Sequence, residues 1–550
     1  MNLIMFSFLM MIFLVMSSLF LMNFILMNKI LILEWNIYSY SSMNFNFLIY
    51  LDYVCLMFLF VVSLISFVVL LYSLDYMKGD LFLNRFVFLL FMFVMSMYFM
   101  ILSPNILTIL FGWDWLGLIS YCLIVYYQSN KSFNSGMLTM FINRIGDVGI
   151  LMLICLSSKF GSWMMMNYYF DMLMLVLLML IAFTKSAQMP FSYWLPVAMM
   201  APTPISALVH SSTLVTAGVY LLIRYNEFLY LNNLNEYILL LSSFTMFMSG
   251  LIANFEYDFK KIIALSTLSQ LGLMISILSI SMWELSFFHL LIHALFKSMM
   301  FLCVGSFIHY YSDEQDIRSF GGSIFIYPFK CFVLVISVIC LMGFPFLSGY
   351  YSKDLIMEMF FFNKMNKFSL LMLIISTSLT VSYSIRMIMF ILFSYKNYNT
   401  NMMIKESILM NMCILILMFM SIVLGKFMYN SFYWMNYIFL SQNFKMFVLK
   451  LLMLGVLMGI YYYYYMFMKN NLFGNFFMSM FFSEYVYKLY IYPLLVAKIY
   501  EMLWEKGLLE YKIKMMNMLY NLSIINVLSY NLYLLLLFMY MFMLMFIMFI

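Results

Sequence analysis

The sequence has 550 residues, of which 66% are hydrophobic and only 9% are charged, and its formal net charge is +6. Soluble domains are about a quarter charged, so this chain lacks the polar surface that a water-soluble protein needs. The basic residues are scattered with no dense run, which argues against nucleic acid as a partner.

Stretches of about 20 mostly apolar residues are long enough to cross a bilayer as helices. The first stretch lacks the basic start and the small-residue cleavage site of a signal peptide, so we expect a membrane span there. The chain is predicted to be an all-α integral membrane protein of about 15 transmembrane helices. The predicted spans are residues 3–27, 52–73, 83–102, 104–127, 134–157, 172–199, 203–224, 237–254, 258–281, 284–309, 328–361, 368–395, 405–426, 445–467 and 527–549.

Two of these spans are interrupted by proline. One contains Lys185-Ser-Ala-Gln-Met-Pro190, and the other contains Gly343-Phe-Pro345 followed by Lys353-Asp354. Proline frees backbone carbonyls in mid-membrane, which is tolerated where the backbone lines a cavity. A lysine beside each broken helix is typical of an ion site, and two breaks five spans apart indicate an internal repeat.

The segment 484–525 differs from the rest because it mixes charged residues with a large apolar face. The pairs Glu484/Lys488 and Glu510/Lys514 are spaced i,i+4, as on the wet side of a helix. We therefore predict an amphipathic helix lying laterally at the membrane surface. Forty residues of helix would extend about 60 Å, far more than a loop between neighbouring spans requires.

Ionisable residues remain inside the predicted spans. Such groups are costly in hydrocarbon, so they usually face protein or water and mark an ion pathway. The spacing i, i+4, i+8 places His289, His293 and Lys297 on one face of one helix, where histidines can pass protons in either direction. We expect a proton relay whose candidate residues are Asp114, Arg144, Asp147, Lys185, His210, His289, His293, Lys297, Lys353 and Asp354.

Structural roles remain open for several of these residues. Arg144 and Asp147 are three positions apart and could form an ion pair that only stabilises their helix. Lys353 and Asp354 could lie near the membrane surface, with the lysine extending to the interface. For Arg386 the sequence gives no role beyond capping its own helix.

The sequence offers no site for a redox cofactor or a metal. The seven cysteines fall inside apolar spans, and no two have Cys-x-x-Cys spacing, so neither an iron–sulfur cluster nor a zinc site is predicted. No two glycines are separated by a single residue, which excludes a Gly-x-Gly-x-x-Gly dinucleotide fingerprint. Nicotinamide or flavin chemistry would have to take place on another chain.

Six motifs stand out along the chain. They are Asn143-Arg-Ile-Gly-Asp147, Lys185-Ser-Ala-Gln-Met-Pro190, Ala201-Pro-Thr-Pro-Ile-Ser-Ala-Leu-Val-His210-Ser-Ser-Thr, Asp258-Phe-Lys-Lys-Ile-Ile-Ala-Leu-Ser-Thr-Leu-Ser-Gln-Leu-Gly272, His289-Leu-Leu-Ile-His293-Ala-Leu-Phe-Lys297 and Tyr351-Ser-Lys353-Asp354. These motifs resemble the antiporter-like subunit family of mitochondrial NADH:ubiquinone oxidoreductase (complex I), its chain 5 subunits in particular. Together with the amphipathic segment before a last span, the resemblance covers nearly the whole chain.

The resemblance implies two inverted five-helix repeats, each with a broken helix, that form two half-channels joined by a polar axis. It implies that Asp114 pairs with Lys185 and that His210 passes protons inward by way of Lys260 and the His289/His293/Lys297 face. Lys353 would be the exit-side site. The family more often has glutamate at the position of Asp114, so we expect this shorter side chain to reach its lysine through water.

The resemblance also implies proton translocation across the mitochondrial inner membrane, driven by electron transfer elsewhere in the complex. FMN, iron–sulfur clusters and ubiquinone would be bound by other subunits, and this chain would hold no cofactor. Its partners would be other complex I subunits, especially neighbouring antiporter-like subunits clamped by the lateral helix, and membrane lipids including cardiolipin. The expected parts are N-terminal transmembrane helices at 1–80, a first repeat at 81–225, a second repeat at 236–396, additional transmembrane helices at 397–480, the lateral helix at 484–525 and a last span at 527–550.

Two alternatives remain from the sequence alone. A stand-alone multi-subunit Na⁺/H⁺ antiporter of the related type has the same core motifs, but its large subunits carry long C-terminal extensions. A structural membrane scaffold would use the buried charges only to hold helices together.

Overall fold

The computed structural model is helical over most of the part of the chain that it describes. The described residues are 2–27, 29–40, 43–165, 171–231, 234–363, 366–394, 406–433, 438–466, 472–481, 493 and 496–497. The chain divides into two units, Met1–Asn470 and Asn471–Ile550. In the second unit the structure describes α19 (Leu472–Met478), and all other elements below belong to the first.

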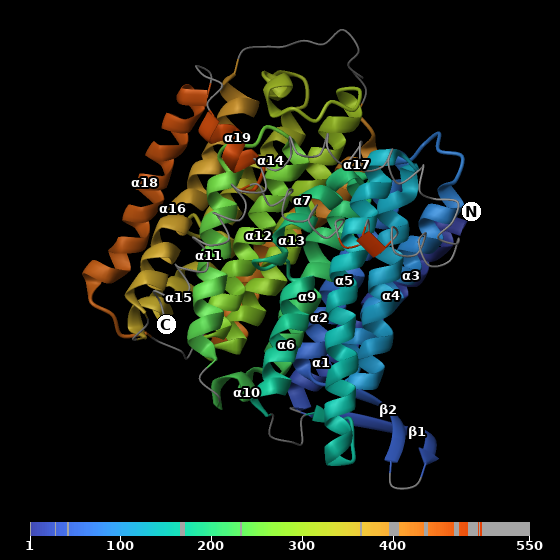
Figure 1. Cartoon of the computed structure of the whole chain (residues 1–550). Coiled ribbons are helices and arrows are strands. Elements are labelled where there is room, and N and C mark those ends of the chain that lie inside the picture. The colour runs from blue at the N-terminus through green and yellow to red at the C-terminus, as the bar shows by residue number, and fades with distance from the viewer. Residues whose placement is uncertain are drawn as a thin grey trace, which may run out of the picture. The chain divides into compact units, whose positions relative to one another are not determined.

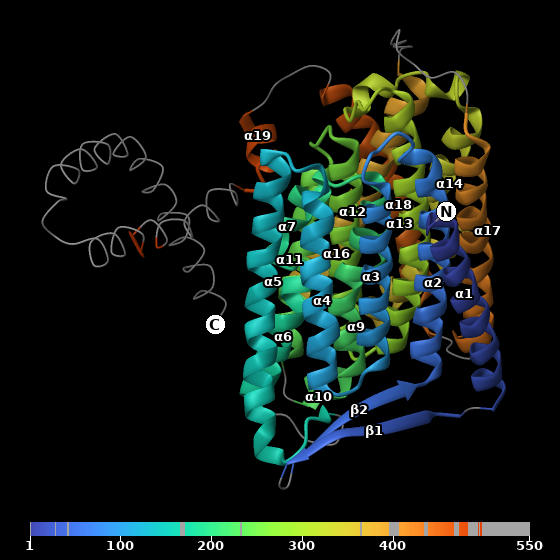
Figure 2. The same ribbon diagram turned by 90° about the vertical axis from the view of Figure 1, so that its right-hand side faces the viewer.

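The helices of the first unit run mostly alongside one another (Figures 1 and 2). They are α1 (Asn2–Met27), α2 (Tyr53–Tyr76), α3 (Leu83–Leu102), α4 (Ile106–Ile124), α5 (Asn130–Ser157), α6 (Met172–Lys185), α7 (Trp194–Val197), α8 (Thr203–Ile205), α9 (Leu214–Arg224), α10 (Asn226–Leu231), α11 (Asn235–Ala253), α12 (Phe259–Leu278), α13 (Trp283–Tyr310), α14 (Pro328–Met342), α15 (Ser348–Phe362), α16 (Lys367–Ile388), α17 (Ile408–Met428) and α18 (Gln442–Met466). Short 3₁₀ and π segments join or extend several of them.

Twelve helices among the described residues are long and apolar enough to cross a membrane. Two further apolar helices, α6 and α14, are shorter because each ends at a break. The predicted helical membrane fold with two broken helices is therefore confirmed, whereas the count of about 15 spans stays a prediction. The predicted span at 527–549 lies outside the described residues, as does the predicted lateral helix at 484–525 except for residues 493, 496 and 497. The division into two inverted repeats stays a prediction.

A β-hairpin between the first two helices was not predicted from the sequence. Strand β1 (Leu31–Tyr40) pairs antiparallel with β2 (Met43–Leu51), with Leu31 opposite Leu51. Strand β1 contains isoleucine, tryptophan and tyrosine, and β2 contains phenylalanine, isoleucine and tyrosine, residues that favour extended backbone. The hairpin lies at the same end of the helices as α10 (Figures 1 and 2).

The interior of the first unit is formed by α12, α13 and the stretch from α8 to α9. In α13 the most apolar 18-residue window is entirely buried, whereas in α1 and α18 only 17% of that window is buried. Outer helices leave large apolar side chains such as Phe8 and Leu457 exposed, as expected where lipid is the solvent. Polar side chains on α12 and α13 therefore face protein.

Both breaks are produced by local sequence. Helix α6 ends at Lys185, and short 3₁₀ and α segments follow until α8 begins at Thr203. Helix α14 ends at Met342, where Gly343 adopts a left-handed conformation with φ +83°. Helix α15 then packs so closely that a Cβ atom on Gly349 would lie 1.8 Å from the Cys340 carbonyl oxygen, so only glycine fits there.

Candidate functional site

Lys185 lies at the end of the first broken helix and is fully buried. Its Nζ donates a hydrogen bond to the Trp113 carbonyl oxygen at 3.3 Å and lies 4.9 Å from the centre of the Trp113 ring. Gly117, one turn along α4, lies beside the ammonium, since a Cβ there would lie 3.5 Å from Nζ, an ordinary van der Waals distance. Lys185 is therefore held by a carbonyl dipole and an aromatic face, both neutral.

Two carboxylates act on Lys185 from neighbouring helices. Asp114 on α4 and Asp147 on α5 both attract it electrostatically and also interact with each other. In the described part of the chain neither carboxylate lies within 4.0 Å of Lys185 Nζ, the limit for an ion pair. Asp114 Oδ1 is buried without a hydrogen-bond partner there. Asp114 and Lys185 thus form no direct ion pair, and the water-mediated contact expected for the shorter aspartate stays a prediction.

Arg144 and Asp147 form the ion pair that their spacing predicts. The Arg144 Nη1 to Asp147 Oδ2 distance is 3.2 Å, and the arginine side chain is 44% exposed while the aspartate is 9% exposed. The exposed arginine thus partly neutralises an acidic pair, Asp114 and Asp147, beside Lys185. The sequence identified all four residues, and the structure brings them together.

His210 lies in a π-helical segment, Ser206–Thr213, that connects α8 to α9. The Thr213 hydroxyl donates to the Leu208 carbonyl at 2.8 Å, five residues back. His210 is 1% exposed, and neither ring nitrogen has a hydrogen-bond partner in the described part of the chain. A π turn within a helix often marks a functional position, and an unpartnered buried imidazole is available to a water or a proton carrier.

Lys260 lies in the first turn of α12 and is 5% exposed. Its Nζ donates to the Ala201 carbonyl oxygen at 3.2 Å, in the segment that follows the first break. Asp313 attracts it electrostatically from the loop after α13. Lys260 therefore connects the first broken region to α12, on the route predicted from His210 to α13.

The predicted face of α13 is fully buried. His289 Nδ1 lies 2.9 Å from the Ser352 hydroxyl, and His289 Nε2 lies 3.2 Å from Gln270 Oε1. Lys297 Nζ donates to the Ser266 hydroxyl at 2.5 Å. His293, between them, has no hydrogen-bond partner on either ring nitrogen among the residues that the structure describes.

Lys353 lies beside the second break. Its Nζ donates to Thr380 Oγ1 at 2.8 Å and to the Leu341 and Met342 carbonyls at 3.5 Å each. Those carbonyls end α14, where the helix dipole favours a cation. Asp354 follows Lys353, and both line a cavity of about 20 Å³, which has room for one water molecule.

The three central lysines share one property. Lys185, Lys297 and Lys353 are buried and hydrogen-bonded to neutral oxygens, and within the described ranges none has a carboxylate within 4.0 Å. Buried charges are usually neutralised by a close partner. The role of these lysines as static ion-pair partners is therefore not supported by their contacts.

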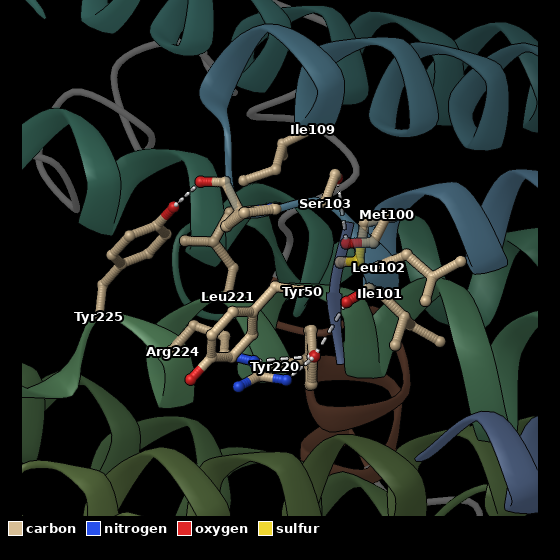
Figure 3. Close-up of a pocket in the computed structure, with 11 residues that line it drawn as sticks. Tyr50, Met100, Ile101, Leu102, Ser103, Ile109, Tyr220, Leu221, Arg224 and Tyr225 are labelled. Atoms are coloured by element: carbon tan, nitrogen blue, oxygen red, sulfur yellow. Dashed lines mark hydrogen bonds between the residues drawn. The ribbon is translucent and has the colours of Figure 1, made fainter. Parts of the chain in front are cut away.

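A second charged cluster was not recognised from the sequence. Arg224, the last residue of α9, binds Asp52 through both carboxylate oxygens, with Nη1–Oδ2 at 2.5 Å and Nη2–Oδ1 at 2.8 Å. Arg224 also donates to the Tyr220 hydroxyl, and these residues border a cavity of about 20 Å³ with Tyr50 and Ser103 (Figure 3). Asp52 in addition caps α2 by accepting from the Cys55 backbone. Since 172 residues separate the partners, no local pattern reveals the pair.

Arg386 does not cap the end of its own helix. Its Nη1 donates across to the Ala253 carbonyl at 3.3 Å, and the guanidinium lies 5.2 Å from the Tyr257 ring centre. The side chain is 1% exposed. It joins α16 to the end of α11.

Comparisons with known proteins give consistent family matches. Residues 103–380 match the family described as NADH:quinone oxidoreductase/Mrp antiporter, TM, and residues 35–87 match NADH-Ubiquinone oxidoreductase (complex I), chain 5 N-terminus. The chain is 48% identical over 455 residues to NADH-ubiquinone oxidoreductase chain 5 of Apis mellifera ligustica, covering 80% of this chain and 81% of that one. It is 52% identical over 402 residues to the protein of the same name from Aedes aegypti, covering 72% and 69%.

Two solved structures share the fold. A chain of the Mrp complex from Dietzia sp. DQ12-45-1b superposes with a TM-score of 0.75 at 18% identity, over 96% of this chain and 63% of that one. A chain of the membrane-bound sulfane sulfur reductase, an archaeal respiratory membrane complex, gives a TM-score of 0.67 at 20% identity, over 83% and 93%. At these identities the likeness concerns the fold alone.

Proposed function

The chain belongs to the NADH-ubiquinone oxidoreductase chain 5 family, and on that premise we propose that it is a proton-translocating membrane subunit of respiratory complex I. The observation that carries the proposal is the setting of Lys185, Lys297 and Lys353, each buried against a neutral acceptor. A lysine whose hydrogen bond goes to a neutral oxygen can release its proton without breaking a close ion pair, which is the event that a relay requires.

The proposed route begins at the first break and ends at the second. Lys185 exchanges protons beside the Asp114/Asp147 pair, and His210 carries them toward Lys260 and α13. His293 and Lys297 pass them on, and Lys353 with Asp354 releases them. Water fills the intervals at His210 and His293, whose ring nitrogens lack partners among the described side chains.

The energy for this transfer comes from electron transfer on other subunits. FMN, iron–sulfur clusters and ubiquinone belong to those subunits in this proposal, since the sequence lacks a dinucleotide fingerprint and cysteine pairs of ligand spacing. The chain is a multi-pass membrane protein, and its family membership supports the mitochondrial inner membrane as its location. We also propose that the segment 484–525 contacts neighbouring antiporter-like subunits and that cardiolipin is among the bound lipids.

The decisive experiment replaces Lys185 by methionine in the assembled complex, reconstituted into sealed vesicles. The side chain keeps its length but loses its charge and its proton. We expect proton translocation during NADH oxidation to fall at least about 100-fold, the lower end of the range that loss of a proton-transfer group produces. Lys159→Met, at an exposed position after α5, is the matched control and should translocate normally.

The alternatives give different results in the same vesicles. A scaffold would assemble and translocate protons at the normal rate with Lys185→Met, which would contradict the proposal. A stand-alone Na⁺/H⁺ antiporter would take up protons in response to a sodium gradient without NADH, and it would purify without flavin and iron–sulfur subunits.

A further inference from the structure

Gln270 occupies a position that links three helices in the polar interior. It lies on α12 and is 1% exposed. Its Oε1 lies 3.2 Å from His289 Nε2 on α13, and its side chain also interacts with the hydroxyl of Tyr383 on α16, itself fully buried. Neither Gln270 nor Tyr383 belongs to the relay proposed above.

The chemistry of the amide fixes the direction of these hydrogen bonds. An amide oxygen can only accept, so His289 Nε2 must carry the hydrogen that it donates to Gln270. A neutral imidazole then has its lone pair on Nδ1, and that nitrogen lies 2.9 Å from the Ser352 hydroxyl. Among the described residues the amide nitrogen of Gln270 has no hydrogen-bond partner, so the orientation of the amide rests on the contact of its oxygen with His289.

We propose that Gln270 is a positioning residue that holds His289 in the Nε2–H tautomer, so that this imidazole takes up and returns protons only at Nδ1, on the side of Ser352. The inference rests on the proposed function, because it assigns one direction to a residue of that relay. Ser352 directly precedes Lys353 in α15, so the tautomer points His289 toward the helix of the exit-side lysine.

Each transfer balances at a single atom. A proton reaching Ser352 adds to its oxygen while the hydroxyl proton moves to His289 Nδ1, which forms the imidazolium with Nε2–H retained. Return breaks the same Nδ1–H bond and restores the hydroxyl. The Gln270 amide neither gains nor loses a proton, so no proton passes from His289 through Gln270 toward Tyr383.

His293 provides the contrast within the same helix. It lies one turn from His289, is equally buried, and has no partner at either nitrogen among the described residues. Its tautomer is therefore free to change as protons pass. The charged and titratable groups that act on His289 are Lys297 and His293 on its own helix and Lys353 on α15.

The test compares two nearly isosteric substitutions in the reconstituted complex, with proton translocation measured from pH 6 to pH 9. Gln270→Leu removes the acceptor, and we expect translocation to fall at least about tenfold. Removing a residue that orients a histidine typically has an effect of about this size. Gln270→Glu keeps an oxygen toward Nε2 but adds a charge that favours the imidazolium. We expect this variant to translocate at more than half the normal rate, with its profile shifted to higher pH.

Three further variants separate the possible outcomes. Thr267→Val, a buried position one turn earlier on α12 whose hydroxyl bonds only the local Ala264 carbonyl, should behave as the unaltered protein. Tyr383→Phe should lower translocation in the same direction as Gln270→Leu but less, whereas Tyr72→Phe, which loses a buried hydroxyl bonded to the Leu302 carbonyl, should not.

Lys297→Met distinguishes failure of the inference from failure of the proposed function. If Lys297→Met abolishes translocation while Gln270→Leu keeps the normal rate and pH profile, the positioning role is wrong and the relay stands. If Lys297→Met also translocates normally, the relay itself is wrong. Equal losses in Gln270→Leu and Gln270→Glu, with no pH shift, would likewise contradict the tautomer assignment.

Discussion

The ammonium of Lys353 lies 2.8 Å from the hydroxyl oxygen of Thr380. The two residues belong to α15 and α16, and the lysine also reaches the last carbonyls of α14. At the second break, therefore, a single lysine of α15 is hydrogen-bonded to both α14 and α16. The Thr380 hydroxyl donates its own hydrogen to the Thr377 carbonyl at 2.7 Å, so it serves Lys353 as an acceptor.

Thr380→Val removes this hydroxyl at almost constant shape. A hydrogen bond to a charged group contributes about 1.5–3 kcal/mol, so we expect proton translocation to fall about tenfold or more while the complex still assembles. The measurement is the ratio of protons moved to NADH oxidised in sealed vesicles. Lys450→Met, at an exposed position on α18, serves as a control for removal of a charge. A normal ratio for Thr380→Val would show that proton transfer at Lys353 does not depend on this contact.

Asp52→Asn tests the ion pair with Arg224 apart from the helix cap. Asparagine caps helices as well as aspartate does, so α2 should still begin at Tyr53, but Arg224 loses its counter-ion. Breaking a buried pair costs about 3–5 kcal/mol, and we expect a clear drop in the thermal denaturation midpoint of the purified complex. The control is Asp171→Asn, at the exposed start of α6, which should leave the midpoint unchanged. An unchanged midpoint for Asp52→Asn would show that the fold does not depend on a negative charge beside Arg224.

The loop after α13 provides a pH-dependent contribution to stability. Partial burial by itself would raise the pKa of Asp316, but its hydrogen bonds to Arg318 and the charge of that arginine outweigh burial and hold the pKa below its ordinary value. Because the folded pKa is the lower one, the pair stabilises the loop above about pH 4 and loses this effect as the pH falls through the folded pKa.

Asp316→Asn should therefore lower loop stability at neutral pH and make no difference in strong acid. Hydrogen exchange of the Ile317–Phe320 amides between pH 3 and pH 7, corrected for the intrinsic exchange rate, measures this directly. A difference between the two proteins that stays constant over the whole range would exclude Asp316 as the titrating group.

The sequence predicted the features that depend on local patterns. The breaks after Lys185 and Met342 follow from proline and glycine, and the spacing of His289, His293 and Lys297 sets their common face. Arg144 and Asp147 pair because three residues separate them on one helix.

The partners of the lysines could not be predicted in this way. Lys297 bonds Ser266 across 31 residues, and Lys185 bonds the Trp113 carbonyl across 72. Serine, threonine and backbone carbonyls carry no charge pattern, so only the packing of helices identifies them as acceptors. The β-hairpin was missed because a short apolar run between two predicted spans does not distinguish strand from loop.

The π turn at Ser206–Thr213 makes the chain sensitive to length as well as to composition. A π turn holds one residue more than an α-helical turn, and the segment Ser206–Thr213 carries His210 within it. Deleting one residue there would restore a regular helix and leave Tyr220 and Arg224 on their present side, but it would rotate the side chains inside the segment, His210 among them. Evolution can therefore exchange side chains in this stretch far more readily than it can add or remove a position.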